Sequence, residues 1–300
     1  MSRPSNVRVA ADVQDGLGES VFWHVAERAL YWIDFYGPTL HRWDPASGAR
    51  RDWTVPGSKH VGSDVPLSDG RILLALDDGL YAFDTKAGTT QRVADPNQGR
   101  PGIGYNDCKV DRAGNFWIGT YDAAERAPRG VLYRIAPDLS VRVADSGYMV
   151  CNGPAFSPDG RILYFSDTSG RRLFAYDLEP ATGMLGVARL FAEIEPDGGI
   201  PDGITVDAEG HVWCAHYGGS RVTRFTPDGV VARTIELPVP FVTSCCFGGG
   251  DLDTLYITTA RAGLDAAALA KAPHSGALFA VEPGVRGIAD RPFKLKLPNA

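Results

Sequence analysis

Four polar residues that carry side-chain oxygens recur at one position relative to a turn. Each stands eight residues ahead of a turn residue: Glu19 before Glu27, Asn106 before Gly114, Asn152 before Gly160 and Asp202 before Gly210. Carboxylate and amide oxygens are the ligands that hard divalent cations prefer in proteins. Two carboxylates buried close together need a cation or a proton, and a cation is the simpler solution. The sequence therefore predicts a metal site, provided that the fold brings the four repeats together.

Each of these residues also has a simpler interpretation when it is considered alone. Glu19 could be a solvated loop carboxylate, and Asn106 and Asn152 could form turns. Asp202 lies in a Pro-Asp-Gly sequence that is typical of ordinary turns. The position shared by all four favours the metal site, because an unpaired carboxylate in a buried core is costly. Asp107 follows Asn106 and should point to the other face of its strand, which predicts a supporting role.

Aromatic-rich strands follow each turn, and their spacing predicts the fold. Their sequences are LYWID, NFWIGT, LYFSD and HVWCAH. The turn glycines Gly70, Gly114, Gly160 and Gly210 are 44, 46 and 50 residues apart, so the 300 residues hold about six such units. A unit of this size is one small sheet that buries its faces only against other copies around an axis. We predict an all-β fold, a six-bladed β-propeller with four-stranded antiparallel blades and the metal site on its central axis.

Six hairpin sequences support this number of blades. They are GPTLHRWDPASG, DGLYAFDTKAG, RGVLYRIAPD, RRLFAYDLEPATG, SRVTRFTPDG and SGALFAVEPG, each an alternating apolar run closed by Pro, Asp or Gly. The last unit begins near residue 243, so we expect one blade to combine strands from both termini. A short surface helix is predicted at 264–271. Because a ring of repeats has one axis, residues 1–300 are interpreted as a single domain.

Composition argues against several classes of partner. A net charge of −6 without any basic run argues against nucleic acid. No apolar stretch approaches the roughly 20 residues that span a bilayer, so we expect no membrane partner. The first residues, MSRPSNVRVAADVQ, lack the apolar segment of a signal peptide, which predicts a cytoplasmic protein. The five cysteines are an odd number and a poor disulfide framework, so we interpret them as small buried side chains.

Several motifs taken together resemble the gluconolactonase and regucalcin (senescence marker protein-like) family of metal-dependent sugar lactonases. They are LGESVFWHVAERALYWID, YNDCKVDRAGNFWIGT, CNGPAFSPDGRILYFSD, PDGITVDAEGHVW, and TSCCFGG followed by LYITTARAGL. The resemblance runs from about residue 18 to residue 287 and implies a six-bladed propeller that hydrolyses aldonolactones with one divalent metal ion. It also implies metal ligands at Glu19, Asn152 and Asp202, and a contact of Asn106 with substrate or with water on the metal.

The chain departs from this resemblance at two substrate-contacting positions. Animal members carry an Arg two residues before the Asn of the ND motif, where this chain has Gly104, and a substrate-contacting Glu falls at Ala124. Arg100 and Glu125 lie close by in the sequence and could take over the lost contacts. For Arg100, a solvated loop arginine is the alternative. The departures leave the metal site intact and point towards a pentonolactone or a 6-modified gluconolactone as substrate.

The expected reaction is hydrolysis of a sugar-acid lactone to the open aldonate in carbohydrate catabolism, with the small-molecule lactone as partner. The metal would polarise the lactone carbonyl, and Asp202 would act as general base for the attacking water. An all-oxygen ligand set suits Ca²⁺, Mg²⁺ or Mn²⁺ better than Zn²⁺, and we favour Ca²⁺. A non-catalytic calcium-binding propeller is one alternative. A protein-binding propeller is another alternative, because LYWID and LYFSD resemble strands of that class.

Overall fold

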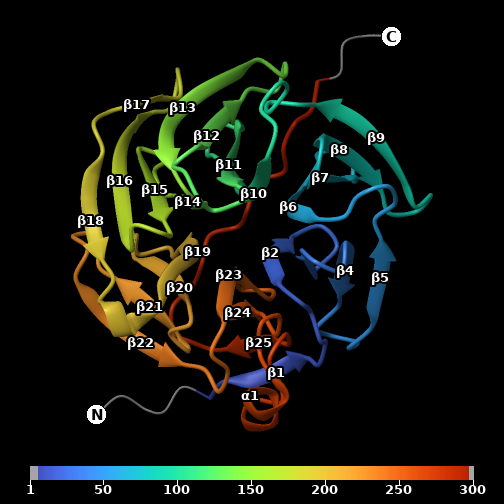
Figure 1. The fold of residues 1–300 in the computed structure, drawn as a ribbon, viewed down its shortest axis with the longest axis vertical. Coiled ribbons are helices and arrows are strands. Elements are labelled where there is room, and N and C mark those ends of the chain that lie inside the picture. The colour runs from blue at the N-terminus through green and yellow to red at the C-terminus, as the bar shows by residue number, and fades with distance from the viewer. Residues whose placement is uncertain (1–5, 297–300) are drawn as a thin grey trace.

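Six antiparallel sheets form a ring in the computed structural model, which describes residues 6–296 (Figure 1). Blade one consists of β2 (Gly18–His24), β3 (Ala29–Asp34), β4 (Thr39–Trp43) and β5 (Arg50–Thr54). Blade two consists of β6 (Val61–Pro66), β7 (Ile72–Leu76), β8 (Gly79–Asp84) and β9 (Thr89–Ala94). Blade three consists of β10 (Ile103–Val110), β11 (Phe116–Asp122), β12 (Gly130–Ile135) and β13 (Val141–Tyr148).

The fourth and fifth blades continue the same order. Blade four contains β14 (Cys151–Phe156), β15 (Ile162–Asp167), β16 (Arg172–Glu179) and β18 (Arg189–Glu193), with the short β17 (Met184–Leu185) paired to the end of β16. A 3₁₀ turn, Pro196–Gly198, leads into blade five, which contains β19 (Ile200–Val206), β20 (Val212–Tyr217), β21 (Arg221–Phe225) and β22 (Val231–Glu236). The predicted six-bladed propeller is therefore confirmed.

Blade six closes the ring with strands from both ends of the chain, as expected. Its inner strands are β23 (Val242–Gly248), β24 (Thr254–Thr259) and β25 (Leu278–Val281), and β1 (Arg8–Ala11) pairs antiparallel with β25. The predicted surface helix is α1 (Ala266–Lys271), which begins where the Asp265 carboxylate accepts the amide of Ala268 at 2.8 Å. From residue 6 to residue 296, no helix is both long and apolar enough to cross a membrane.

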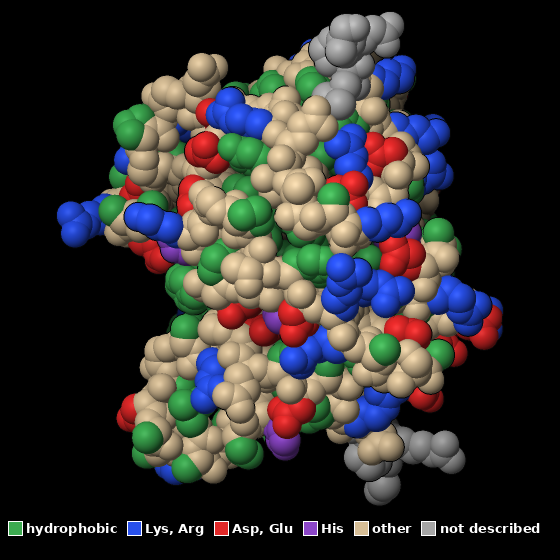
Figure 2. Space-filling model, turned by 90° about the vertical axis from the view of Figure 1, so that its right-hand side faces the viewer, with side chains coloured by type: hydrophobic (Ala, Val, Ile, Leu, Met, Phe, Trp, Pro, Cys, Tyr) green, Lys and Arg blue, Asp and Glu red, His purple; other side chains and the backbone are tan. Residues whose placement is uncertain are grey.

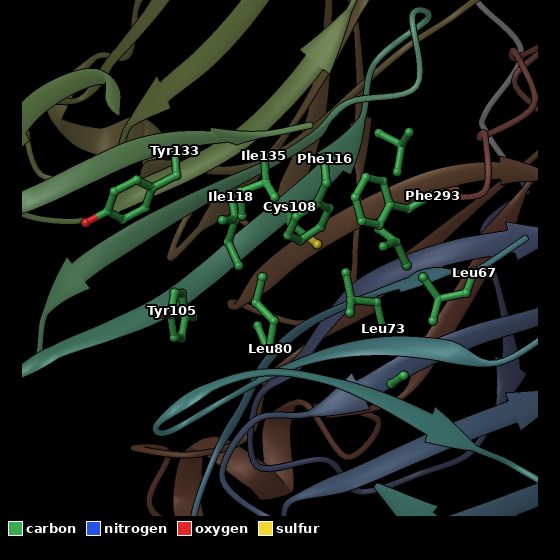
Figure 3. Packing of buried hydrophobic residues seen from close by; sticks show 14 of the residues in the cluster. Leu67, Leu73, Leu80, Tyr105, Cys108, Phe116, Ile118, Tyr133, Ile135 and Phe293 are labelled. Atoms are coloured by element: carbon green, nitrogen blue, oxygen red, sulfur yellow. The ribbon is translucent and has the colours of Figure 1, made fainter. Parts of the chain in front are cut away.

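The core lies between neighbouring blades, because each sheet buries both faces against the next sheet. Phe116 and Ile118 of β11 meet Leu73 of β7 and Leu80 of β8 between blades three and two (Figure 3). The aromatic strands that the sequence singled out are the second strands of their blades, and Trp32, Trp117 and Trp213 are fully buried in them. All five cysteines are buried and free, as predicted.

The segment that follows β25, residues 282–296, crosses the middle of the ring (Figure 1). It pairs with the end of blade five at Asp207–Gly287 and with the end of β6 at Leu67–Phe293. Phe293 is 1% exposed and packs 5.7 Å from the ring of Phe116 (Figure 3). We call residues 282–296 the C-terminal strap. It covers the ends at which the innermost strands finish, so the axis is closed on that side.

Acidic and basic side chains are interspersed over the outer surface that faces the viewer in Figure 2. Many of the acids lie in the turns of the hairpins and accept backbone amides there. Asp44 accepts the amide of Ala46 at 2.8 Å, and Asp84 accepts that of Lys86 at 2.8 Å. These hydrogen bonds explain why Asp recurs at the turns.

Candidate metal centre

The innermost strand of every blade carries a β-bulge. The register shifts between Glu19 and Phe22 in β2, Val61 and Ser63 in β6, Tyr105 and Cys108 in β10, Asn152 and Ala155 in β14, Pro201 and Ile204 in β19, and Val242 and Cys245 in β23. An extra residue breaks the alternation of side chains and changes the direction in which one of them points. All four residues that the sequence singled out lie at or within these bulges.

These four residues, Glu19, Asn106, Asn152 and Asp202, line one pocket of about 550 Å³. The other two blades contribute no carboxylate or amide at the bulge. In blade two the position is Gly62, because a Cβ there would lie 2.8 Å from the carbonyl carbon of Tyr105. The structure thus brings together the predicted residues of blades one, three, four and five. That they hold a metal ion stays a prediction.

Hydrogen bonds fix the two asparagine amides. Asn106 donates its Nδ2 to Asn152 Oδ1 and to the carbonyl of Cys151, both at 2.8 Å. Asn152 in turn donates Nδ2 to Thr168 Oγ1 at 2.9 Å. Both NH₂ groups are directed to protein acceptors, which leaves Asn106 Oδ1 and the second lone pair of Asn152 Oδ1 for a ligand. Amide oxygens suit a hard cation.

The two carboxylates of the pocket are buried without a cationic partner. Glu19 is 9% exposed and Asp202 is 5% exposed, and within residues 6–296 neither forms an ion pair. Burial raises the pKa of Glu19 well above its ordinary value, and the charges of Asp202 and Asp107 raise it further. Burial, followed by the charge of Asp107, likewise raises the pKa of Asp202. A divalent cation between the carboxylates would relieve both effects, so these donors fit such an ion.

Asp107 lies close to the site, since its charge raises the pKa of both Glu19 and Asp202. The expectation that it points away from Asn106 relied on strand alternation, which the bulge between Tyr105 and Cys108 interrupts. Asp107 Oδ1 accepts the amide of Cys108 at 2.8 Å and its Oδ2 accepts the amide of Gly153 at 3.1 Å. Burial raises the pKa of Asp107 to about 6. Because Gly153 follows Asn152 directly, this carboxylate ties β10 to the bulge that presents Asn152.

Arg100 is not brought to the pocket. Its guanidinium donates to Tyr133 Oη at 2.9 Å and to Asn97 Oδ1 at 3.4 Å, and it also contacts the carbonyl of Arg129. It lines a separate surface pocket beside β12 and β13. Glu125, the other proposed substitute, does line the pocket. The substrate contact expected of Arg100 therefore has no geometric support, since these contacts hold its side chain elsewhere.

The sequence interpretation missed the residues that follow the second strands. Tyr36, Tyr121 and Tyr217 line the pocket, as do His60 and Thr168. In an antiparallel pair the second strand ends beside the start of the first strand. Residues that end or follow LYWID, NFWIGT and HVWCAH could therefore have been assigned to the same end of the axis as the four ligands.

The turn of blade one also differs from the expectation. The sequence comparison placed Glu27 at the turn position that a glycine occupies in the other repeats. In the structure, the residue with a left-handed backbone at this turn is Arg28, at φ 51°. Gly114, Gly160 and Gly210 have positive φ at that point. Glu19 therefore stands nine residues before its turn residue rather than eight. Glu19 lines the pocket nevertheless.

A second acidic cluster lies at the strap end of blade five. Single ligand atoms of Asp207, Glu209 and His211 lie within 4.8 Å of one another. Asp207 accepts Trp213 Nε1 at 2.9 Å and Arg224 at 2.8 Å, and Arg224 also contacts Glu209 at 2.6 Å. The guanidinium occupies the place of a cation, so this cluster is better explained as an ion-pair network.

Comparison with known proteins identifies related chains over nearly the whole sequence. A family profile described as "SMP-30/Gluconolactonase/LRE-like region" matches residues 17–261. A 6-deoxy-6-sulfogluconolactonase of Pseudomonas putida is 37% identical over 278 residues, which cover 92% of this chain and 94% of that protein. A regucalcin of Danio rerio is 36% identical and covers 95% of this chain, with 97% of its own length matched.

Among solved structures, the calcium-binding protein regucalcin of Agrobacterium tumefaciens superimposes with a TM-score of 0.92 and 31% identity. The match covers 97% of this chain and 98% of that one. The similarity therefore includes all six blades and the innermost strands that carry the four pocket residues.

Proposed function

Because the chain belongs to the SMP-30/gluconolactonase/LRE-like family, we propose that it hydrolyses a sugar-acid lactone to the open aldonate with one divalent cation. The observation that carries this proposal is a pair of buried carboxylates, Glu19 and Asp202, beside two oriented amides in a pocket of about 550 Å³. That volume lies within the range of roughly 300–1,000 Å³ typical of small-molecule sites.

Glu19, Asn152 and Asp202 would hold the cation in this proposal. When bound, the cation would supply an electrophile that polarises the lactone carbonyl and stabilises negative charge on its oxygen. The hydrogen bonds from Asn106 and to Thr168 keep the amide of Asn152 oriented for that role. Asn106 itself also lines the pocket, and we place it next to the substrate.

Asp202 would accept the proton of the attacking water. Asp202 lines the pocket, and a carboxylate oxygen within hydrogen-bonding reach of water can take its proton. Water oxygen forms a bond to the carbonyl carbon, the bond from that carbon to the ring oxygen breaks, and Asp202 passes the proton to the departing ring oxygen. The atoms balance without another co-reactant, and the product is the open aldonate.

A lactone panel tests the proposal. Metal-stripped protein and protein reloaded with Ca²⁺, Mg²⁺, Mn²⁺ or Zn²⁺ are mixed with glucono-, galactono- and pentonolactones, and acid release is followed above the spontaneous rate. We expect hydrolysis only in reloaded samples. Hydrolysis at the same rate by stripped protein, or no hydrolysis by any reloaded sample, would contradict it.

Calcium binding without catalysis is the second candidate, because relatives at 36% identity in sequence and at a TM-score of 0.92 in structure bear the name regucalcin. The same experiment separates the two. Tight Ca²⁺ binding combined with no turnover of any lactone would favour this candidate over the lactonase.

A further inference from the structure

We propose that the segment from Tyr121 to Glu125 determines the specificity of this pocket. In this assignment the segment admits an uncharged lactone with several hydroxyl groups and excludes lactones that carry an anionic substituent. Because it names the substrate class of the same site, this assignment rests on the proposed function. Three features carry it: the ring of Tyr121, the charges of the pocket wall, and the positions of the nearby arginines outside the cleft.

Tyr121 occupies the space beside Gly104. A Cβ added to Gly104 would fall 2.7 Å from the phenol oxygen of Tyr121 and closer still to its ring carbons. Only glycine at 104 leaves room for this ring. Tyr121 lines the main pocket and an adjoining one of about 260 Å³, so its ring separates two compartments of one cleft. Any longer side chain at 104, including a cationic one, is excluded by the tyrosine.

Two further tyrosines give the main pocket an aromatic wall. Tyr217 is stacked on Phe241, with ring centroids 4.2 Å apart and planes within 4°. Tyr36 meets Phe35 edge to face at 5.1 Å. Burial raises the pKa of Tyr121 and of Tyr217 to about 12, so both phenols stay neutral in ordinary buffers. Rings held in this way offer apolar faces to the C–H groups of a sugar and hydroxyl groups to its oxygens.

The charges that face the cleft are mainly negative. Among the described residues that line either compartment there is no Lys or Arg. The lining also includes the imidazole of His60, whose Nδ1 lies 2.9 Å from the carboxylate of Asp77. If a divalent cation neutralises Glu19 and Asp202, the carboxylate of Glu125 still faces the substrate. An anionic substituent would meet this charge without a counter-ion.

The backbone fixes the position of Glu125. Its amide donates to the carbonyl of Asp122 at 2.8 Å, and its φ is 48°, in the left-handed region. The Asp122 carboxylate also accepts the amides of Arg126 and Ala127, at 2.9 and 3.2 Å. The loop is therefore a tight turn that holds Glu125 at the pocket wall.

Arg126 follows Glu125 directly, and its exposed side chain lines neither compartment of the cleft. The next two arginines along the chain and in space, Arg129 and Arg100, are held by other contacts. Arg129 lies 3.1 Å from the Asp122 carboxylate and donates to the carbonyl of Pro101 at 2.7 Å. Arg100 is held by Tyr133 and Asn97. Both line the separate surface pocket beside β12 and β13. Since none of the three arginines lines the cleft, none supplies there the cation that a sulfonate, phosphate or carboxylate substituent would require.

Two lactones of the same ring size test the assignment: glucono-1,5-lactone and its 6-deoxy-6-sulfo derivative. For the wild-type protein reloaded with metal, we expect kcat/KM to be at least about tenfold higher for the uncharged lactone, equivalent to about 1.4 kcal/mol. Glu125→Lys should raise kcat/KM about tenfold for the sulfonated lactone alone. The control is Glu236→Lys, the same charge change at an exposed residue of β22, which should alter neither value.

The outcomes separate the assignment from the function on which it rests. Equal or greater kcat/KM of the wild type for the sulfonated lactone overturns the assignment, and so does a Glu125→Lys protein with unchanged selectivity. If neither lactone is hydrolysed, the proposed function fails, and calorimetric titration with both lactones still measures selectivity. Binding of the sulfonated lactone as tight as that of the neutral one would then overturn the assignment.

Discussion

The two ends of the propeller axis contain similar residues in different surroundings. At the pocket end, Glu19 and Asp202 are buried and form no ion pair within the part of the chain that the structure describes. At the strap end, Asp207 is held by Arg224 at 2.8 Å, and Asp290 lies 3.3 Å from the ammonium of Lys109. Asp207 and Asp290 have partners in the protein and stabilise the ring, whereas Glu19 and Asp202 line the pocket without such partners and are available to a ligand. For these four acids, the presence of a partner distinguishes the structural contacts from the binding site.

The same substitution at both ends should have opposite effects. Asp202→Asn should lower kcat/KM for the best lactone about 10³-fold, as expected for the loss of a general base and metal ligand, while the midpoint of thermal unfolding stays the same or rises. Asp207→Asn removes the charge that Arg224 faces and should lower the midpoint without changing the rate per folded molecule. Steady-state kinetics and calorimetry on both variants measure the contrast. An Asp202→Asn protein with native turnover at saturating metal would remove the distinction between the two ends.

The strap should contribute stability without touching the chemistry. Phe293 is 1% exposed between blades two and three, so Phe293→Ala should cost about 3–4 kcal/mol of unfolding free energy. Denaturant titration measures this loss, and lactonase rates at low temperature should remain native. A Phe293→Ala protein with native stability but reduced turnover would show that the strap acts on the pocket.

The ion pair between Lys109 of β10 and Asp290 of the strap should have a smaller effect. The side chains of Lys109 and Asp290 are 16% and 19% exposed, so water reaches both in part. Lys109→Met should therefore cost about 2 kcal/mol, less than the roughly 3–5 kcal/mol lost when a fully buried pair is broken. The double variant Lys109→Met/Asp290→Leu should recover part of this stability. No recovery would mean that Lys109 acts mainly through Asp107, whose charge also raises the pKa of Lys109.

The two asparagines at the pocket end should differ from each other. Asn152→Ala should weaken metal affinity about tenfold, whereas Asn106→Ala should mainly reduce kcat, about tenfold, because we place Asn106 beside the substrate. Metal titrations and steady-state rates on both variants separate these effects. Equal losses of metal affinity would show that Asn106 is itself a ligand.

Much of the fold could be predicted because propeller repeats are local. The spacing of Gly114, Gly160 and Gly210 gives the blade length, and blade length sets the number of blades that 300 residues can form. The four oxygen-bearing residues were identifiable because equivalent positions of repeats face one axis. The pairing of an N-terminal strand with blade six could be predicted because the sixth unit begins too late in the chain to supply all four strands of its blade.

The pocket walls and the strap were less accessible to sequence interpretation. Tyr36, Tyr121 and Tyr217 come from three different blades, and their meeting depends on ring geometry rather than on neighbouring residues. Arg100 is close to the ND motif in sequence, yet a contact with Tyr133 of β12 holds it elsewhere. The strap contains no repeat motif, and its position depends on long-range contacts such as that of Phe293 with blades two and three.

Calorimetric titration of metal-stripped protein with Ca²⁺, followed sample by sample with lactonase assays, tests the account most directly. We expect one ion per chain, activity that rises in proportion to occupancy, and loss of both in Glu19→Gln. Native activity in stripped protein would contradict the account. A Glu19→Gln variant that binds Ca²⁺ as tightly as the wild type would also contradict it, because the ion would then lie somewhere other than between the two buried carboxylates.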